Sequence, residues 1–189
     1  MINCKNLGKA LKRDGKPAYW FKTEKYDYIT DGYFIAKTGK RLELEKGISN
    51  AVIGMFKGIP EIGQGLQINR GEYKSAQIED SQKKSFIEMI DNVPSAKIIP
   101  TGLITKRTTV EMKQFEDVIF ESPEGYTFVD RMYADMINEI PDTGMIELYG
   151  SKPTHPIYAV GDDEVVMLFP VRYQKTDIPK YLKVLENDR

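Results

Sequence analysis

Five basic side chains near the N-terminus have the type and spacing needed to bind a polyanion. They lie within or just after residues 4–14, which we expect to form a helix, and they are Lys5, Lys9, Lys12, Arg13 and Lys16. At about 100° per residue, this basic side faces away from an apolar side that contains Leu7 and Leu11. Such a stripe can neutralise DNA phosphates and release counterions without reading sequence. The alternative is an ordinary solvated face of an amphipathic helix.

Other residues that could do chemistry are sparse. Asp162, Asp163 and Glu164 could supply oxygen ligands to a hard cation, although the flanking strand pattern favours a solvated hairpin turn. Cys4 and His155 are the single cysteine and histidine, which leaves a Cys/His zinc site short of ligands. The sequence has no phosphate-binding loop, dinucleotide fingerprint or nucleophile elbow. We therefore expect no metal, no cofactor and no enzymatic activity, and we rank a metal-dependent hydrolase last.

The elements around the basic segment must position it. Asn3 can cap the first helix, while Gly15 and Pro17 can end it. A tight turn is expected at Asp31-Gly32. Aromatic and β-branched residues predict strands near 18–23, 26–30, 33–37, 118–120, 126–128, 145–149, 156–160 and 164–173. Apolar spacing over 129–140 predicts a second helix that Pro141 ends.

The middle of the chain, residues 46–114, has a weaker pattern. Glycines punctuate its first part, for which we expect no regular structure. A helix is expected over 81–91, with Phe86, Met89 and Ile90 on its apolar face, followed by strands near 97–99 and 103–111. The predicted fold class is therefore α+β, with two halves, each a helix followed by antiparallel strands, around a divergent middle segment.

Composition agrees with a folded domain. Of 189 residues, 41% are hydrophobic and 11% aromatic, which argues against intrinsic disorder. No apolar run approaches the ~20 residues of a membrane span, and the N-terminus lacks the apolar core of a signal peptide. Together with the single cysteine, these features lead us to expect a reducing cytoplasm and no membrane partner.

Charge is distributed unevenly along the chain. Residues 1–46 hold 11 basic and 6 acidic residues, whereas residues 115–174 hold 3 basic and 12 acidic residues. This asymmetry predicts weak, salt-sensitive association of copies through head-to-tail contacts, as a weak homo-oligomer. The alternative is chance segregation on a well-mixed folded surface, because thirds of a sequence need not be thirds of a surface.

Several short motifs occur near the two ends of the chain. They are Phe21-Lys22-Thr23-Glu24, Tyr28-Ile29-Thr30-Asp31-Gly32-Tyr33-Phe34-Ile35-Ala36, Tyr126-Thr127-Phe128-Val129, Met145-Ile146-Glu147-Leu148, Pro156-Ile157-Tyr158 and Val165-Val166-Met167-Leu168-Phe169-Pro170-Val171-Arg172. In this order they resemble the bacterial DNA polymerase sliding clamp. The resemblance implies a single clamp-like domain over 1–174, with halves at about 1–45 and 115–174 and an insert-like middle at 46–114. Residues 175–189 are expected to form a C-terminal tail, in which the spacing of Tyr181, Leu182 and Leu185 independently predicts a short helix.

The resemblance also implies a function. A protein of this kind is a non-enzymatic DNA-replication accessory protein that binds DNA non-specifically through basic helices, docks peptides of replication proteins, or does both. By motif matching, the docking pocket corresponds to Pro156, Met167, Phe169, Pro170 and Arg172. The alternative for Met167 and Phe169 is a place in the core of the sheet. The alternative function is a protein-interaction module or regulator on the same fold that does not bind DNA.

Overall fold

The structure is a computed structural model that describes residues 2–12, 17–45, 48, 51–69, 74–109, 111–137, 146–173 and 182. Within these residues, two antiparallel sheets are combined with short helices, so the fold class is α+β as the sequence predicts. No helix in the described ranges is long and apolar enough to span a bilayer.

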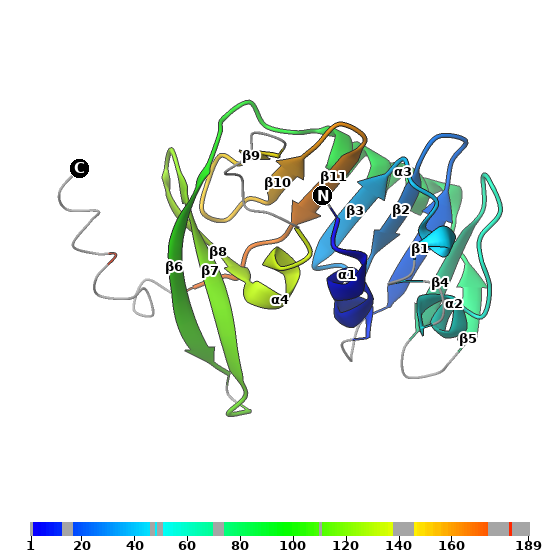
Figure 1. The fold of residues 1–189 in the computed structure, drawn as a ribbon, viewed down its shortest axis with the longest axis horizontal. Helices are drawn as coiled ribbons and strands as arrows, with labels where there is room; N and C mark the ends of the chain where they lie inside the picture. The colour runs from blue at the N-terminus through cyan, green and yellow to red at the C-terminus, as the bar shows by residue number, and fades with distance from the viewer. Residues whose placement is uncertain are drawn as a thin grey trace.

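An eight-stranded antiparallel sheet forms the centre of the fold (Figure 1). Its strand order is β5-β4-β1-β2-β3-β11-β10-β9. The strands are β1 (Ala18–Lys22), β2 (Asp27–Thr30), β3 (Phe34–Thr38), β4 (Gly65–Asn69), β5 (Lys74–Gln77), β9 (Glu147–Tyr149), β10 (Ile157–Val160) and β11 (Glu164–Leu168). β3 pairs with β11, and Ala36 lies opposite Val166. This pair joins the N-terminal and C-terminal thirds of the chain in one sheet.

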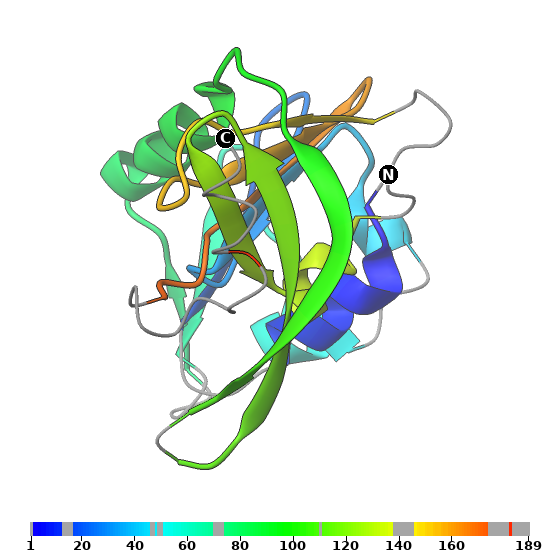
Figure 2. The same cartoon turned by 90° about the vertical axis from the view of Figure 1, so that its left-hand side faces the viewer.

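Helices cover both faces of this sheet. On one face lie α1 (Cys4–Leu11), α2 (Ala51–Phe56) and α4 (Arg131–Ala134), and on the other lies α3 (Asp80–Asp91). Figure 1 shows the first three in front of the strands, and Figure 2 shows the sheet between the two layers. Trp20 and Ile29 pack in the α1 layer, whereas the stacked rings of Phe21 and Tyr28 pack on the α3 side. Strand alternation therefore builds two cores, one on each face.

A three-stranded sheet stands beside α4 and faces the viewer in Figure 2. Its strands are β6 (Ile99–Thr108), β7 (Gln114–Ser122) and β8 (Gly125–Asp130). Val118 and Val129 pack into the core that α1 shares, whereas Ile119 and Phe128 pack on the opposite face. Buried Leu182, the one described residue of 174–189, belongs to that opposite cluster. Val171, Tyr173 and Leu182 thus pack against the outer face of the small sheet, and the rest of 174–189, with the short helix expected there, lies outside the described residues.

The N-terminal elements begin close to where the sequence predicts them, although α1 ends at Leu11, with Lys12 as its C-cap, and not at residue 14 as predicted. The Oδ1 atom of Asn3 accepts a hydrogen bond from the Asn6 backbone N–H at 3.1 Å and caps α1. Gly32, with φ at 84°, forms the turn between β2 and β3. α3 also confirms the helix predicted over 81–91, and its apolar face packs on the sheet. The predicted Gly15 cap lies outside the described residues.

The first part of the middle segment contains regular structure that the sequence does not predict. Its elements are α2 and the strands β4 and β5, and a 3₁₀ turn (Leu42–Leu44) lies just before this segment. A Cβ atom at Gly65 would lie only 2.8 Å from Phe21 Cβ and from Ile78 Cδ1. This glycine therefore permits the close approach that β4 needs to pair with β1, and the expectation of a loop there is wrong.

The helix predicted over 129–140 is also wrong in extent. Val129 pairs with Val118 in the small sheet, and the Asp130 side chain caps a helix of a single turn. After Ala134 the chain turns, and Ile137 forms an isolated bridge with Ile2. Val129, Tyr133, Met136 and Ile137 are buried and Met132 is half-buried, but a strand, a turn of helix and a bridge share them, so apolar spacing alone does not define the element. Residues 138–140 of the predicted helix, and Pro141 after it, lie outside the described residues.

Two further strand predictions need correction. The strands predicted at 97–99 and 103–111 are one strand, β6, whose pairing with β7 shifts register between Pro100 and Ile104. The last strand ends at Leu168 instead of residue 173. Beyond it, the N–H of Val171 donates to the carbonyl oxygen of Phe128, so the chain crosses to the small sheet after Pro170.

We predict that Glu164 makes the stability of the fold depend on pH. Burial acts to raise the pKa of this carboxyl, but the hydrogen bond from the Ile2 N–H and the charge of Lys40 lower it more, and the net pKa lies below its usual 4.5. Its contribution to stability is therefore complete above that value and is lost as pH falls below it. In urea titrations, Glu164→Gln should destabilise the protein at pH 7, and the difference should shrink below about pH 4.5. Glu88→Gln, at a side chain that is 62% exposed, controls for the loss of one charge.

Candidate nucleic-acid interface

The predicted basic stripe lies on the solvent side of α1. Leu7, Ala10 and Leu11 are buried in the core, and this fixes the opposite side outward. Lys5, Lys9 and Lys12 are all exposed. On an ideal helix they fall within an arc of about 60° and extend over about 10 Å of its axis. Arg13 and Lys16, the other two predicted members, lie outside the described residues.

These three lysines carry no ion pair with any acid of the described residues. Elsewhere in the same ranges, lysines are commonly paired: Lys22 contacts Glu43 and Lys37 contacts Asp91, each at 2.6 Å. On α1, the ammonium of Lys9 instead donates to the neutral Asn6 Oδ1 atom at 3.2 Å. Positive charge on this helix is therefore left to solvent or to a ligand.

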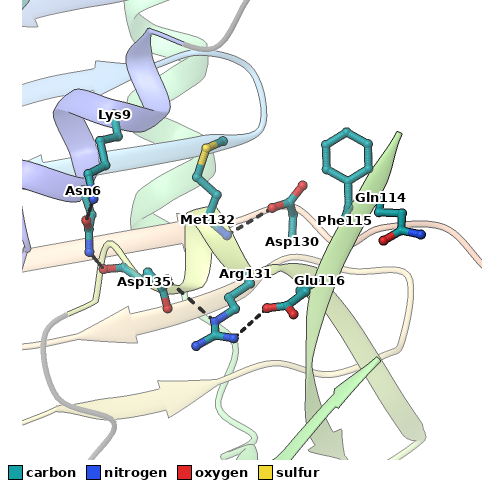
Figure 3. Close-up of a pocket in the computed structure, with 9 residues that line it drawn as sticks. All are labelled: Asn6, Lys9, Gln114, Phe115, Glu116, Asp130, Arg131, Met132 and Asp135. Carbon is teal, nitrogen blue, oxygen red and sulfur yellow. Dashed lines mark hydrogen bonds and ion pairs between the residues drawn. The ribbon is translucent and has the colours of Figure 1, made fainter. Parts of the chain in front are cut away.

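A hollow of about 430 Å³ opens beside this helix (Figure 3). Its walls are formed by α1, by α4, and by the start of β7 and the end of β8 in the small sheet. Its lining residues are Asn6, Lys9, Gln114, Phe115, Glu116, Asp130, Arg131, Met132 and Asp135. The amide of Asn6 donates to the backbone oxygen of Asp135 at 2.7 Å and so ties α1 to the end of α4. This hydrogen bond therefore holds α1 and α4 next to each other where they line the hollow.

The charged groups of the hollow are mostly paired with one another. The guanidinium of Arg131 donates to Glu116 Oε2 at 2.6 Å and lies 3.9 Å from a carboxylate oxygen of Asp135. The hydrogen bond to Glu116 raises the pKa of Arg131 above its usual value, so this side chain stays charged. Asp130 accepts from the Met132 N–H and lies 3.8 Å from Arg107. Negative charge gathers on the α4 and β7 side, and positive charge on α1.

The residues predicted to dock a partner peptide differ widely in exposure. Met167 is only 1% exposed and belongs to the core on the face that α3 covers. Phe169 is half-buried against the same core, and Pro156 and Pro170 are also half-buried. Arg172 is exposed. The prediction of a docking pocket stays a prediction, but this chain's own helix α3 covers the face on which Met167 lies.

The other chemistry-bearing residues do not converge. Burial, with the nearby charge of Glu45, raises the pKa of the Cys4 thiol to about 11, so it is a poor nucleophile. The Oγ atom of Ser151 lies 3.1 Å from His155 Nδ1 on an exposed turn. Glu164 turns inward to Ile2 and Thr38, away from its exposed neighbours in the sequence. Within the described ranges no three ligand-type side chains gather around a point that could hold a metal.

Sequence reasoning identified the lysines but not the hollow beside them. The lysines follow from helical periodicity, which is a local signal. The hollow depends on how α4 and β7 approach α1, and the residues of these elements are more than 100 positions away in the sequence. The acidic charge of residues 115–174 was the one available signal, since Glu116, Asp130 and Asp135 all belong to it.

Comparison with solved structures gives a weak structural likeness. No family model matches the chain, and no curated protein matches it. Among solved structures it is similar to a "Putative DNA polymerase III beta subunit" from Eubacterium rectale, with 13% identity and a TM-score of 0.36. That match covers 91% of this chain and 64% of the other, so this chain spans less than two thirds of that protein's length. A likeness of this strength carries no functional argument.

Proposed function

We propose that this protein is a non-enzymatic DNA-binding accessory protein with a clamp-like fold, which holds the phosphate backbone against α1 without reading sequence. The observation that carries the proposal is the stripe formed by Lys5, Lys9 and Lys12. All three are exposed on one side of a capped helix, and no acid of the described residues neutralises them.

The spacing of the stripe suits a nucleic-acid backbone. One strand of a duplex carries a phosphate about every 3.4 Å along the axis, so about 10 Å of helix can follow about three phosphates. Lysine binds phosphate as a flexible point charge, which favours affinity over sequence recognition. Binding should therefore be non-specific and strongly dependent on salt.

The order of the elements supports the two-half, clamp-like interpretation. α1 precedes β1, β2 and β3, whereas α4 precedes β9, β10 and β11, and the two sets of strands meet at the β3–β11 pair. Both helices pack on the same face of the sheet. Two such halves would present α1 and α4 to the same ligand, although the acids beside α4 make α1 the main phosphate contact.

We expect Lys5→Gln combined with Lys12→Gln to weaken DNA binding while leaving the fold intact. Each lysine that contacts a phosphate contributes about one unit to the slope of log affinity against log salt, so the slope should flatten by about two units. The measurement is fluorescence anisotropy with a random-sequence duplex over a series of salt concentrations.

The matched control replaces two exposed lysines elsewhere, Lys25→Gln with Lys84→Gln, and so changes the net charge equally. An equal loss of slope in this control would show that net charge, and not α1, binds DNA. An unchanged slope in the α1 variant would contradict the proposal. Melting temperatures of both variants should stay close to the wild type, as is usual for surface substitutions.

A separate observation favours a second candidate, an interaction module that does not bind DNA. A mostly apolar hollow of about 610 Å³ lies between the end of β1 and α3, with Phe21 and Ile87 in its wall. At its edge Ile62 is 59% exposed. An exposed apolar site of this kind suits a side chain of a partner protein. The absence of DNA binding at low salt would favour this function over the first.

A further inference from the structure

We propose that the hollow between α1, α4 and β7 accepts one unstacked base of a single-stranded nucleic acid whose backbone lies along the α1 lysines. This inference rests on the proposed function and assigns a ligand class to the hollow beside the same helix. Figure 3 shows Lys9 and Asn6 on one side of it and Phe115, Glu116 and Arg131 on the other.

The size and the walls of the hollow suit a base. A volume of about 430 Å³ lies within the range of small-molecule sites. Phe115 contributes an aromatic ring, which also contacts the Arg107 guanidinium at 4.9 Å, and Met132 adds an apolar surface. Aromatic rings are the usual platforms for bases of single strands, because every base has a π face.

The charge distribution sets the orientation of such a ligand. Lys5 and Lys12 lie along α1 and do not line the hollow, whereas Glu116, Asp130 and Asp135 do. Carboxylates repel a phosphate but accept hydrogen bonds from the amino group of a base. The phosphates should therefore lie on the helix and the base should enter the hollow.

The hydrogen-bonding state of the acids makes this recognition chemically feasible. The pair with Arg131 uses the Oε2 atom of Glu116 and leaves its Oε1 atom as an acceptor. The contact of Arg131 with Asp135 is long, at 3.9 Å, and does not saturate that carboxylate. Cytosine, which carries an exocyclic amino donor, should therefore bind better than thymine, which has a carbonyl oxygen at that position.

Single-stranded nucleic acid is the expected ligand because the base must leave its stack. A base inside a duplex is stacked on both sides, and extruding it costs free energy that a single strand does not require. A duplex should therefore use the lysine stripe alone, whereas a single strand should use the stripe and the hollow together.

The test compares oligomers of about 12 nucleotides, a length within the usual site size of single-strand-binding folds. The probes are oligo-dC, oligo-dT and an abasic strand with the same number of phosphates, each measured by fluorescence anisotropy with the full chain. We expect oligo-dC to bind about tenfold more tightly than the abasic strand, with oligo-dT between them.

The variant Phe115→Leu keeps apolar volume but removes the aromatic face. It should reduce the advantage of oligo-dC over the abasic strand to about twofold or less, while the affinity for the abasic strand stays unchanged. Tyr26→Leu, at a half-buried ring on the α3 side of the large sheet, is the matched control and should leave the advantage intact. Melting temperatures monitor folding, and the wild-type ratio tests the inference without any variant.

Two outcomes overturn the inference, and they separate it from the proposed function. The first outcome is that oligo-dC and the abasic strand bind with equal affinity, while the Lys5 and Lys12 variant still binds both more weakly. This would support phosphate binding by the lysine stripe and contradict a base site in the hollow. The second outcome is that the Phe115→Leu variant still binds oligo-dC about tenfold more tightly than the abasic strand, as the wild type is expected to do. This would show that the preference for oligo-dC does not come from the hollow. Absence of binding to all probes at low salt would overturn the proposed function and the inference together.

Discussion

Replacing Asp117 with Ala is expected to lower the free energy of unfolding by about 3–5 kcal/mol, because it removes one partner of a buried ion pair. The Asp117 side chain is fully buried in β7 and accepts hydrogen bonds from Nε of Arg107 at 3.0 Å and from Nη2 at 3.3 Å. It also accepts from the hydroxyl of Tyr173. Without the carboxylate, the half-buried guanidinium of Arg107, which is 24% exposed, loses its principal counterion.

Urea unfolding followed by circular dichroism measures this effect, and two further variants separate its causes. Tyr173→Phe removes one donor only and should cost about 1–2 kcal/mol. Arg107→Met combined with Asp117→Leu removes both charges and should be much milder than Asp117→Ala, because no unpaired charge stays buried. A loss below about 1 kcal/mol for Asp117→Ala would mean that the pair adds little to stability.

Asp117 also holds residue 173 against the small sheet, through the hydrogen bond from the Tyr173 hydroxyl. Burial and the hydrogen bond to Asp117 raise the pKa of the Tyr173 hydroxyl, so it stays a neutral donor over the physiological range. Its ring packs against Phe128, at 4.4 Å between centroids. Asp117→Ala should therefore loosen the C-terminal segment before the rest of the fold, and limited proteolysis would detect cleavage near residue 173.

Local sequence patterns were enough to predict the strands nearest the N-terminus. β1, β2 and β3 follow one another through short turns, so alternation and the Asp31-Gly32 turn define them without distant contacts. The capped helix before them is equally local. These are also the elements that carry the lysine stripe, which explains why this part of the candidate site could be read from residue types alone.

The parts that the sequence did not predict depend on contacts between distant residues. Gly65 looks like a loop residue until the positions of Phe21 and Ile78 are known. Val129 belongs to a strand because Val118 lies opposite it, although its spacing also fits a helix. The hollow beside α1 is formed by α1, α4 and β7 together, so no local sequence pattern predicts it.

Replacing Met167 with Ala tests whether the predicted docking residues lie in a pocket or in the core. The Met167 side chain is 1% exposed between β3 and β10, on the face that α3 covers. Its truncation should leave a cavity and cost about 2–5 kcal/mol of stability. The control Met167→Leu conserves volume and should cost less than about 1.5 kcal/mol.

Neighbouring variants make the comparison specific. Phe169→Ala, at a half-buried ring, should cost less than the about 3–5 kcal/mol of a fully buried phenylalanine, and Arg172→Ala, at an exposed side chain, should change stability by no more than about 0.5 kcal/mol. A loss of stability that increases with the burial of the side chain is the result expected if Met167 lies in the core. A Met167→Ala variant that melts like the wild type would instead mean that α3 lifts from this face in solution. The docking pocket implied by the clamp resemblance would then be open to a partner peptide.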